Sequence, residues 1–113
     1  MATILIADDS ATVRSTVKVH LMGHGFEFLE AEDGSRALRL LRMVPVALAI
    51  VDYRMPGLDG IALMERVRSA SGISSRVPFI LVSSDHDKTL RERALAAGAS
   101  TFLRKPVNAT ELV

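Results

Sequence analysis

The sequence contains no cysteine and no tryptophan, and its aromatic residues are four phenylalanines and one tyrosine. The absence of cysteine excludes disulfides and thiolate metal sites. No apolar run approaches the ~20 residues that a helix needs to span a bilayer, and residues 1–3 lead straight into the first apolar run, which leaves no room for a signal peptide. The formal net charge of +1 gives no reason to expect a polyanionic partner. We therefore expect a cytoplasmic protein that binds neither nucleic acid nor membranes directly.

What is present suits one folded domain. The chain has 113 residues, of which 49% are hydrophobic and 24% charged. That length can bury a single core, and the composition is ordinary for a globular protein. We see no linker, internal repeat or low-complexity segment, so we expect one domain over residues 1–113.

Strand-like and helix-like segments alternate along the chain. We expect strands at 4–7, 26–31, 46–51, 79–82 and 100–103. We expect helices at 10–21, 34–43, 61–67 and 90–97, and a fifth that Asn108 caps and of which only 109–113 remains. The run at 26–31 only partly alternates, which predicts an edge or half-exposed strand. Alternation of this kind predicts an α/β fold with a parallel sheet covered on both faces.

Reactive side chains follow four of these strands. They are Asp8-Asp9, Asp52, Ser83-Ser84 and Lys105. The carboxyl ends of parallel strands share the edge where open α/β sheets bind ligands. Three close carboxylates raise one another's pKa unless a cation neutralises them, and oxygen-only ligation suits Mg²⁺. Each group alone has an ordinary explanation as a turn, cap or surface residue, but their joint occurrence favours a site.

The ordered set of these motifs resembles the receiver domain of two-component response regulators, including the small chemotaxis-type ones. The motifs are Asp8-Asp9-Ser10, Asp52 with Met55-Pro56-Gly57 and Asp59-Gly60 behind it, Ser83, Phe102 and Lys105-Pro106. The resemblance covers nearly all 113 residues. It implies a doubly wound five-stranded parallel sheet in the order 2-1-3-4-5, a flavodoxin-like receiver fold with a shortened last helix.

The resemblance also implies a chemistry. Asp52 would accept a phosphoryl group from the phosphohistidine of a sensor histidine kinase or a phosphotransfer protein. Asp9, Asp52 and the backbone carbonyl of Arg54 would ligate Mg²⁺, with Asp8 holding it through water. Lys105 would offset charge on the phosphoryl oxygens. The domain is then a signalling phosphoacceptor with intrinsic phosphotransfer and autodephosphorylation activity, and not an enzyme in the usual sense.

The same resemblance implies a switch. Ser83 would donate a hydrogen bond to the phosphoryl group and draw its loop inward, and Phe102 would rotate into the space vacated. The change would be read on the surface made by the expected helix at 90–97, the strand at 100–103 and the last helix. A downstream protein target or an attached output domain would recognise this surface, and two copies could also pair through it as a dimer.

Several positions depart from the usual pattern or add to it. Ser84 stands where the family commonly has Ala or Gly, and Phe102 replaces the commoner Tyr. We expect Arg54 and Asp85 to lie at the mouth of the pocket and to lengthen the lifetime of the aspartyl phosphate. We also expect the Lys105–Pro106 peptide bond to be cis, because the turn must bring Lys105 back towards the acids.

Two further features are expected from the sequence. The last helix stops at Val113, about two turns short of the family's, so either the chain was cut from a larger protein or a partner completes that face. We expect apolar surface to stay partly uncovered there and the chain to self-associate. The stripe of Arg36, Arg39 and Arg42 is interpreted as a solvated helix face and not as a binding patch.

Two other classes of function remain open. A haloacid-dehalogenase-like phosphatase also uses a strand-end aspartate with Mg²⁺, but it requires D-x-D after the first strand, whereas here the acids are adjacent and Ser10 follows them. A pseudo-receiver would act only as a binding module, and its expected mark is a missing pocket residue. No pocket residue is missing here, although an intact pocket indicates competence and not use.

Overall fold

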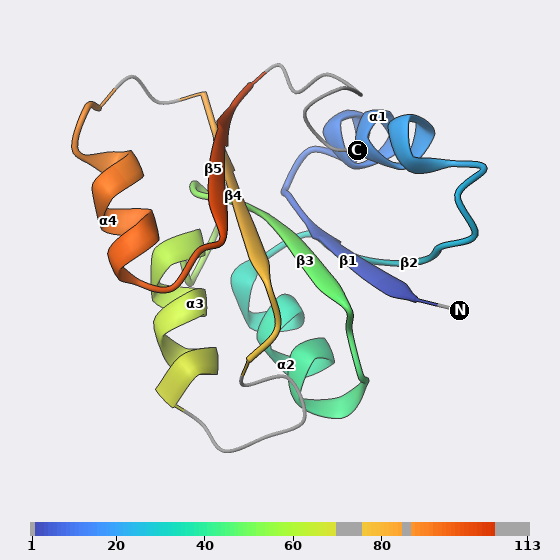
Figure 1. Cartoon of the computed structure of the whole chain (residues 1–113), viewed down its shortest axis with the longest axis horizontal. Helices are drawn as coiled ribbons and strands as arrows, with labels where there is room; N and C mark the ends of the chain where they lie inside the picture. The colour runs from blue at the N-terminus through green and yellow to red at the C-terminus, as the bar shows by residue number, and fades with distance from the viewer. Residues whose placement is uncertain (1, 70–75, 85–86, 106–113) are drawn as a thin grey trace.

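The structure is a computed structural model that describes residues 2–69, 76–84 and 87–105. Strands and helices alternate in it from end to end (Figure 1). Their bounds are β1 Thr3–Ala7, α1 Ala11–Leu21, β2 Glu27–Ala31, α2 Gly34–Met43, β3 Leu48–Asp52, α3 Gly60–Ser69, β4 Phe79–Ser83, α4 Leu90–Ala96 and β5 Thr101–Arg104. The expected α/β alternation is confirmed.

The five strands form one parallel sheet in the order β2-β1-β3-β4-β5. This confirms the order that the family resemblance implied. The register sets Ala7 beside Val51, Asp52 beside Val82 and Ser83 beside Arg104. The carboxyl ends of β1, β3, β4 and β5 therefore meet at one edge, where side chains from four segments of the chain can converge.

Helices cover both faces of the sheet. In Figure 1, α1 lies on one side of the sheet, and α2, α3 and α4 lie on the other. Successive strand side chains point to opposite faces, so Ile4 and Ile6 pack in the cluster that includes Val17 and Leu21 of α1, whereas Leu5 packs in the larger cluster with α2, α3 and α4. The central strands are buried on both sides, which explains why they appear in the sequence as continuous apolar runs.

Local sequence signals begin and end the helices. The Ser10 hydroxyl accepts a hydrogen bond from the Val13 N–H at 3.3 Å and caps α1. The Asp33 carboxylate accepts one from the Arg36 N–H at 2.8 Å and caps α2. After α1 the chain turns through Gly23, whose φ of +87° lies in the region that favours glycine.

The observed bounds differ slightly from those expected. β3 begins at Leu48 and not at Val46, although the Ala47 N–H already donates to Thr3 O at 2.8 Å. β2 is an edge strand with partly exposed residues, as its partial alternation predicted. The expected fifth helix at 109–113, the Lys105–Pro106 bond and Asp85 lie outside the described residues. None of the helices described has the length and apolar content needed to cross a membrane.

Candidate functional site

Three carboxylates meet where β1 and β3 end side by side. One carboxylate oxygen each from Asp8, Asp9 and Asp52 lies within 4.8 Å of the other two. Asp8 and Asp52 are buried, with exposed fractions of 3% and 6%, whereas Asp9 is exposed. All the donors are oxygens and one side of the group is open to solvent. This donor set suits a hard cation that keeps water or phosphate ligands, as Mg²⁺ does.

Lys105 lies within ion-pair distance of two of these acids. Its Nζ is 2.9 Å from Asp8 Oδ2 and 3.2 Å from Asp52 Oδ1. Its backbone N–H donates to Ser83 O at 3.0 Å, which holds the end of β5 against the end of β4. In the sheet, β5 lies on the other side of β3 from β1. The Lys105 ammonium group therefore reaches Asp8 and Asp52 from the side opposite β1.

The electrostatics of the site centre on Asp52. Burial raises the pKa of Asp52 from 3.8 to about 6, the negative charge of Asp8 adds to the rise, and the ammonium of Lys105 counteracts it. Burial alone would lower the pKa of Lys105, but its hydrogen bond to Asp8 and the charges of Asp52 and Asp8 hold it above its usual value. One ammonium group does not balance three carboxylates, so a further cation would favour the ionised site.

Asp8 is held in place by two groups of the α1 segment. The Ser10 N–H donates to Asp8 Oδ1 at 2.9 Å, and Arg14 Nη1 donates to the Asp8 carbonyl oxygen. Arg14 Nε also pairs with Glu30 Oε1 at 3.0 Å. The sequence analysis did not identify Arg14. The available signal was its position in the first turn of the helix that follows the acidic pair.

The segment after Asp52 folds back on the end of β3. The Tyr53 N–H donates to Val82 O at 2.9 Å, and the Gly60 N–H donates to Tyr53 O at 2.8 Å. A Cβ at Gly60 would lie 2.5 Å from Leu81 Cδ1 and 2.7 Å from Asp52 O, so only glycine fits there. This close approach explains why a glycine follows Asp59 in the motif.

Ser83 and Phe102 lie at the neighbouring strands. Ser83 ends β4 and is buried, with 2% of its surface exposed. The Phe102 ring is also buried and belongs to the larger core cluster, with the Arg104 guanidinium 5.8 Å from its centre. The ring is therefore already packed inward in this structure. Its predicted rotation stays a prediction.

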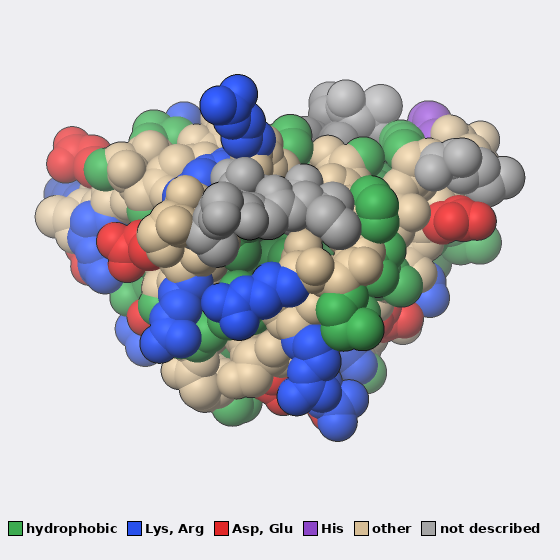
Figure 2. All heavy atoms as spheres, turned by 90° about the horizontal axis from the view of Figure 1, so that it is seen from below, with side chains coloured by type: hydrophobic (Ala, Val, Ile, Leu, Met, Phe, Trp, Pro, Cys, Tyr) green, Lys and Arg blue, Asp and Glu red, His purple; other side chains and the backbone are tan. Residues whose placement is uncertain are grey.

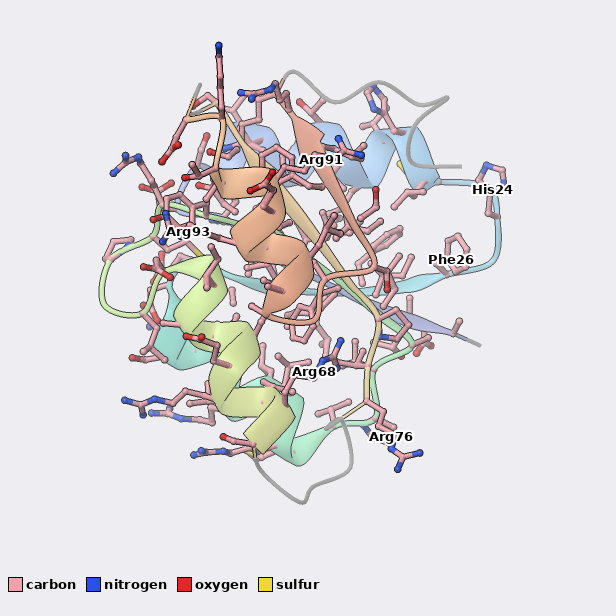
Figure 3. The ribbon with its side chains drawn as sticks, turned by 60° about the vertical axis from the view of Figure 1, so that its left-hand side comes forward. His24, Phe26, Arg68, Arg76, Arg91 and Arg93 are labelled. Atoms are coloured by element: carbon pink, nitrogen blue, oxygen red, sulfur yellow. The ribbon has the colours of Figure 1, made fainter. Side chains whose placement is uncertain are left out.

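Arg54 and Tyr53 line an open hollow next to Asp9. Arg54 is exposed, and its guanidinium lies 5.6 Å from the centre of the Tyr53 ring. The guanidinium of Arg93 on α4 lies 5.8 Å from the centre of the same ring. Arg93 Nη2 also donates to the Tyr53 hydroxyl at 3.3 Å (Figure 3 labels Arg93). The sequence analysis missed this contact, because 40 residues separate the two side chains. Asp85, which we expect at the mouth of the pocket with Arg54, lies outside the described residues.

The family model of the response regulator receiver domain matches residues 4–113. The chain belongs to this family. It is 39% identical over 114 residues to "Response regulator GtcR" of Aneurinibacillus migulanus, a match that covers 98% of the chain and 44% of the relative. It is 34% identical over 110 residues to "Two-component response regulator ORR5" of Oryza sativa subsp. japonica, covering 96% of the chain and 81% of the relative.

The structural comparison agrees with the sequence comparison. The chemotaxis protein CheY4 of Vibrio cholerae superposes with a TM-score of 0.88 at 29% identity, covering 99% of this chain and 92% of the other. The chain is thus a two-component receiver domain, the phosphoacceptor module of a signalling system. It spans less than half the length of GtcR.

Proposed function

We propose that Asp52 is the phosphoacceptor of this receiver domain. Its buried carboxylate lies at the end of the central strand, with Lys105 Nζ 3.2 Å away and oxygens of Asp8 and Asp9 within 4.8 Å. This convergence is the observation that carries the proposal. An Asp52 oxygen attacks the phosphorus of a phosphohistidine on a sensor histidine kinase or phosphotransfer protein. The P–N bond breaks as the O–P bond forms, and the histidine nitrogen leaves with the electron pair.

The acidic group would hold Mg²⁺ for this reaction. Asp9, Asp52 and the backbone carbonyl of Arg54 are the proposed direct ligands, and Asp8 is the proposed ligand through water. The oxygen-only donor set and the open side at Asp9 support this assignment. When bound, the cation supplies positive charge that offsets the charge of the phosphoryl oxygens.

Lys105 and Ser83 complete the proposed pocket. The Lys105 ammonium already bridges Asp8 and Asp52, so a phosphoryl oxygen bound at Asp52 lies within its reach. The Ser83 hydroxyl donates a hydrogen bond to another phosphoryl oxygen. Ser83 is buried, Lys105 is half-buried, and both lie at strand ends. Charges and hydrogen-bond donors that are already in position supply most of the catalysis in phosphoryl transfer.

The readout is proposed on the surface that includes α4 and β5. Phosphorylation adds roughly −1.5 to −2 charges, and the Ser83 bond to the phosphoryl group transmits this change to Phe102 on β5. An output domain or a separate target protein then recognises this surface, or a second copy pairs with it. Autodephosphorylation by water ends the signal. We propose that the cycle takes place in the cytoplasm.

The proposal is tested with acetyl phosphate and the purified chain. Intact mass is followed over time with Mg²⁺ and with EDTA in its place. A Mg²⁺-dependent adduct of one phosphoryl mass that decays after the donor is removed supports a working receiver. Steady hydrolysis of the donor without any adduct would indicate a haloacid-dehalogenase-like phosphatase, and no reaction would indicate a pseudo-receiver.

A further inference from the structure

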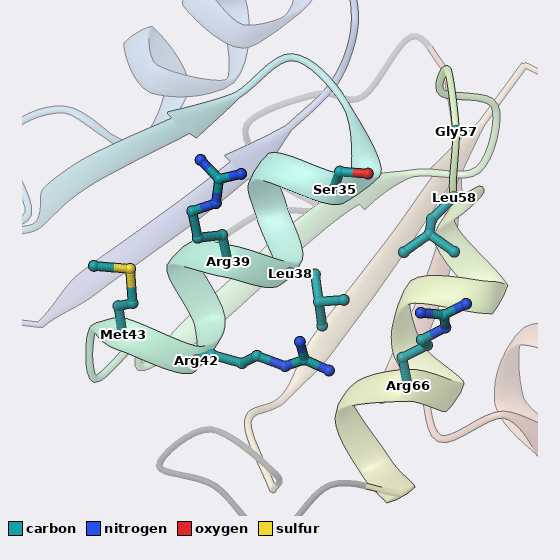
Figure 4. A pocket seen from close by; sticks show the side chains of 8 residues that line it. All are labelled: Ser35, Leu38, Arg39, Arg42, Met43, Gly57, Leu58 and Arg66. Atoms are coloured by element: carbon teal, nitrogen blue, oxygen red, sulfur yellow. The ribbon is translucent and has the colours of Figure 1, made fainter.

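A groove lies between α2 and α3, on the helical face away from α1 (Figure 4). Leu38 lies at its base with 7% of its surface exposed, and the partly buried Leu58 lies beside it. Met43 extends the apolar strip to the end of α2 and is 67% exposed. The residues that line the groove are Ser35, Leu38, Arg39, Arg42, Met43, Gly57, Leu58 and Arg66. An apolar strip of this kind, partly exposed, is suited to contact with a partner.

Three arginines surround this strip. Arg39 and Arg42 lie one turn apart on α2, and Arg66 lies on α3 across the groove. All three side chains are exposed, and no carboxylate of the described residues lies within ion-pair distance of them. In Figure 4 the Arg42 side chain extends across the groove below Leu38, towards α3. The groove therefore holds three positive charges that nothing described in the chain neutralises.

The neighbouring Arg36 shows that this arrangement is local. It belongs to the same stripe of α2, but its Nη2 lies 3.5 Å from Glu32 Oε1 and its Nε lies 3.9 Å from Asp33 Oδ2. The whole chain has 14 basic and 13 acidic residues, so the positive groove is not a consequence of an overall excess of charge. Figure 2 views the molecule from below and shows Lys and Arg side chains next to hydrophobic ones on that face.

We propose that this groove, the α2–α3 groove, is a docking site for an acidic amphipathic segment of a partner protein. Carboxylates of the segment pair with the guanidinium groups of Arg39, Arg42 and Arg66, which are shaped for bidentate contacts with carboxylates. Apolar side chains of the segment pack on Leu38, Leu58 and Met43. A helix with an apolar stripe flanked by acids presents both kinds of group on one side.

The lining favours a protein segment over a nucleic acid or a small phosphate ligand. Among the described residues, no aromatic side chain lines the groove, so a nucleobase would find no ring to stack on. Apolar and cationic groups lie side by side along two helices, a pattern that matches an extended amphipathic surface better than a single phosphate. The proposal gives Arg39 and Arg42 a binding role, where the sequence alone led us to expect a solvated helix face.

The proposal does not depend on phosphorylation. Gly57 lines both the groove and the hollow next to Asp9, so the two places adjoin through the loop that follows β3. Binding is nevertheless measured on the unphosphorylated chain. Failure of the docking proposal would therefore leave the proposed role of Asp52 untouched, and the converse also holds.

The test uses two synthetic peptides of equal charge. One has leucine at every third or fourth position and glutamate elsewhere, and the other has serine in place of each leucine. The ¹⁵N-labelled chain is titrated with each, and affinities are measured by fluorescence anisotropy. We expect the leucine peptide to shift resonances of α2, α3 and residues 57–58. Shifts confined to other surfaces, or equal binding of both peptides, would overturn the proposal.

Variants of exposed residues sharpen the test. Arg39→Ala, Arg42→Ala and Arg66→Ala together should weaken binding of the leucine peptide about tenfold, as loss of several exposed charge pairs predicts. The matched control is Arg76→Ala, Lys88→Ala and Arg91→Ala, three exposed residues that do not line the groove, so equal charge is removed elsewhere (Figure 3 labels Arg76 and Arg91). Met43→Ser should weaken binding of the leucine peptide only.

Three further results would contradict the proposed docking site. The first is an equal loss in the control triple variant, which would indicate general attraction between opposite charges. The second is binding of single-stranded DNA or pyrophosphate to the groove as tight as that of the leucine peptide. The third is unchanged peptide binding in the groove variant. Because the peptide titration of the unaltered chain stands on its own, poor folding of a variant would not remove the test.

Discussion

Asp52 combines burial with a cluster of like charges. Its folded pKa of about 6 lies above its ordinary value of 3.8. The folded state therefore holds this proton more tightly than the unfolded state does. Without a cation, ionisation of Asp52 lowers the stability of the fold as the pH rises from about 4 to about 6. The carboxylate is retained at a cost to stability, as is common where a charge serves a function.

Asp52→Asn should therefore stabilise the metal-free chain at neutral pH. We expect the free energy of unfolding in EDTA at pH 7.5 to rise by about 1–3 kcal/mol, because a shift of one pKa unit corresponds to about 1.4 kcal/mol and Lys105 loses one of its two partners. The gain should shrink below pH 6 and vanish only near about pH 3, because Asp52 is protonated in both states only below its ordinary pKa of 3.8. Urea unfolding at the two pH values measures it, with the exposed Glu92→Gln as control. An equal gain at both pH values would contradict the assigned pKa.

Arg54 should lengthen the lifetime of the aspartyl phosphate. It lies over Tyr53 and lines the open hollow next to Asp9. Arg54→Ala and Arg54→Asn should each speed loss of phosphate about threefold, equivalent to under about 1 kcal/mol in the barrier. The decay of the phosphorylated mass measures it, and Arg36→Ala is the remote arginine control. Unchanged or slower decay would make Arg54 a spectator or a helper in positioning water.

At the element scale, the turn from β3 into α3 depends on Gly60. A Cβ there would meet Leu81 and the backbone of Asp52 and Tyr53, and backbone atoms cannot move aside as a flexible side chain can. Gly60→Ala should lower the free energy of unfolding by about 1–3 kcal/mol, the usual cost of overpacking. It should also slow phosphorylation, because the clash displaces Asp52. Glu65→Ala, on the exposed side of α3, is the control, and equal stability of the two variants would contradict the argument.

Much of the element structure could be predicted from the sequence. The buried strands are short apolar runs, and the cap residue Ser10 lies where the first helix begins, so the existence and type of the described elements followed from local signals. The order of the strands did not follow from them, and the family resemblance supplied it. Contacts such as Arg68 Nη2 with Gly98 O at 2.8 Å could not be predicted. They join side chains that only the tertiary fold brings together.

At the scale of the whole molecule, the acidic group couples metal binding to stability. Mg²⁺ held as proposed would relieve repulsion among Asp8, Asp9 and Asp52, so it should raise the free energy of unfolding by about 2.7 kcal/mol at a hundredfold excess over its Kd. The effect should fall as the pH drops through about 6, since protonation of Asp52 competes with the metal. Thermal melts with MgCl₂ and with NaCl of equal ionic strength measure it. Persistence of the effect in Asp9→Asn would contradict the proposed ligand set.

The central claim is that the strand ends of one sheet bring together a phosphoryl-transfer site whose acceptor is Asp52. The most direct measurement is the location of the phosphoryl group after reaction with acetyl phosphate and Mg²⁺. Unaltered protein, Asp52→Asn and the control Asp87→Asn are compared by intact mass and peptide mapping. Asp87 is an exposed aspartate that is not part of the acidic group. The account predicts one phosphoryl mass, located on Asp52, in the unaltered and Asp87→Asn proteins and none in Asp52→Asn. Undiminished phosphorylation of Asp52→Asn would contradict it.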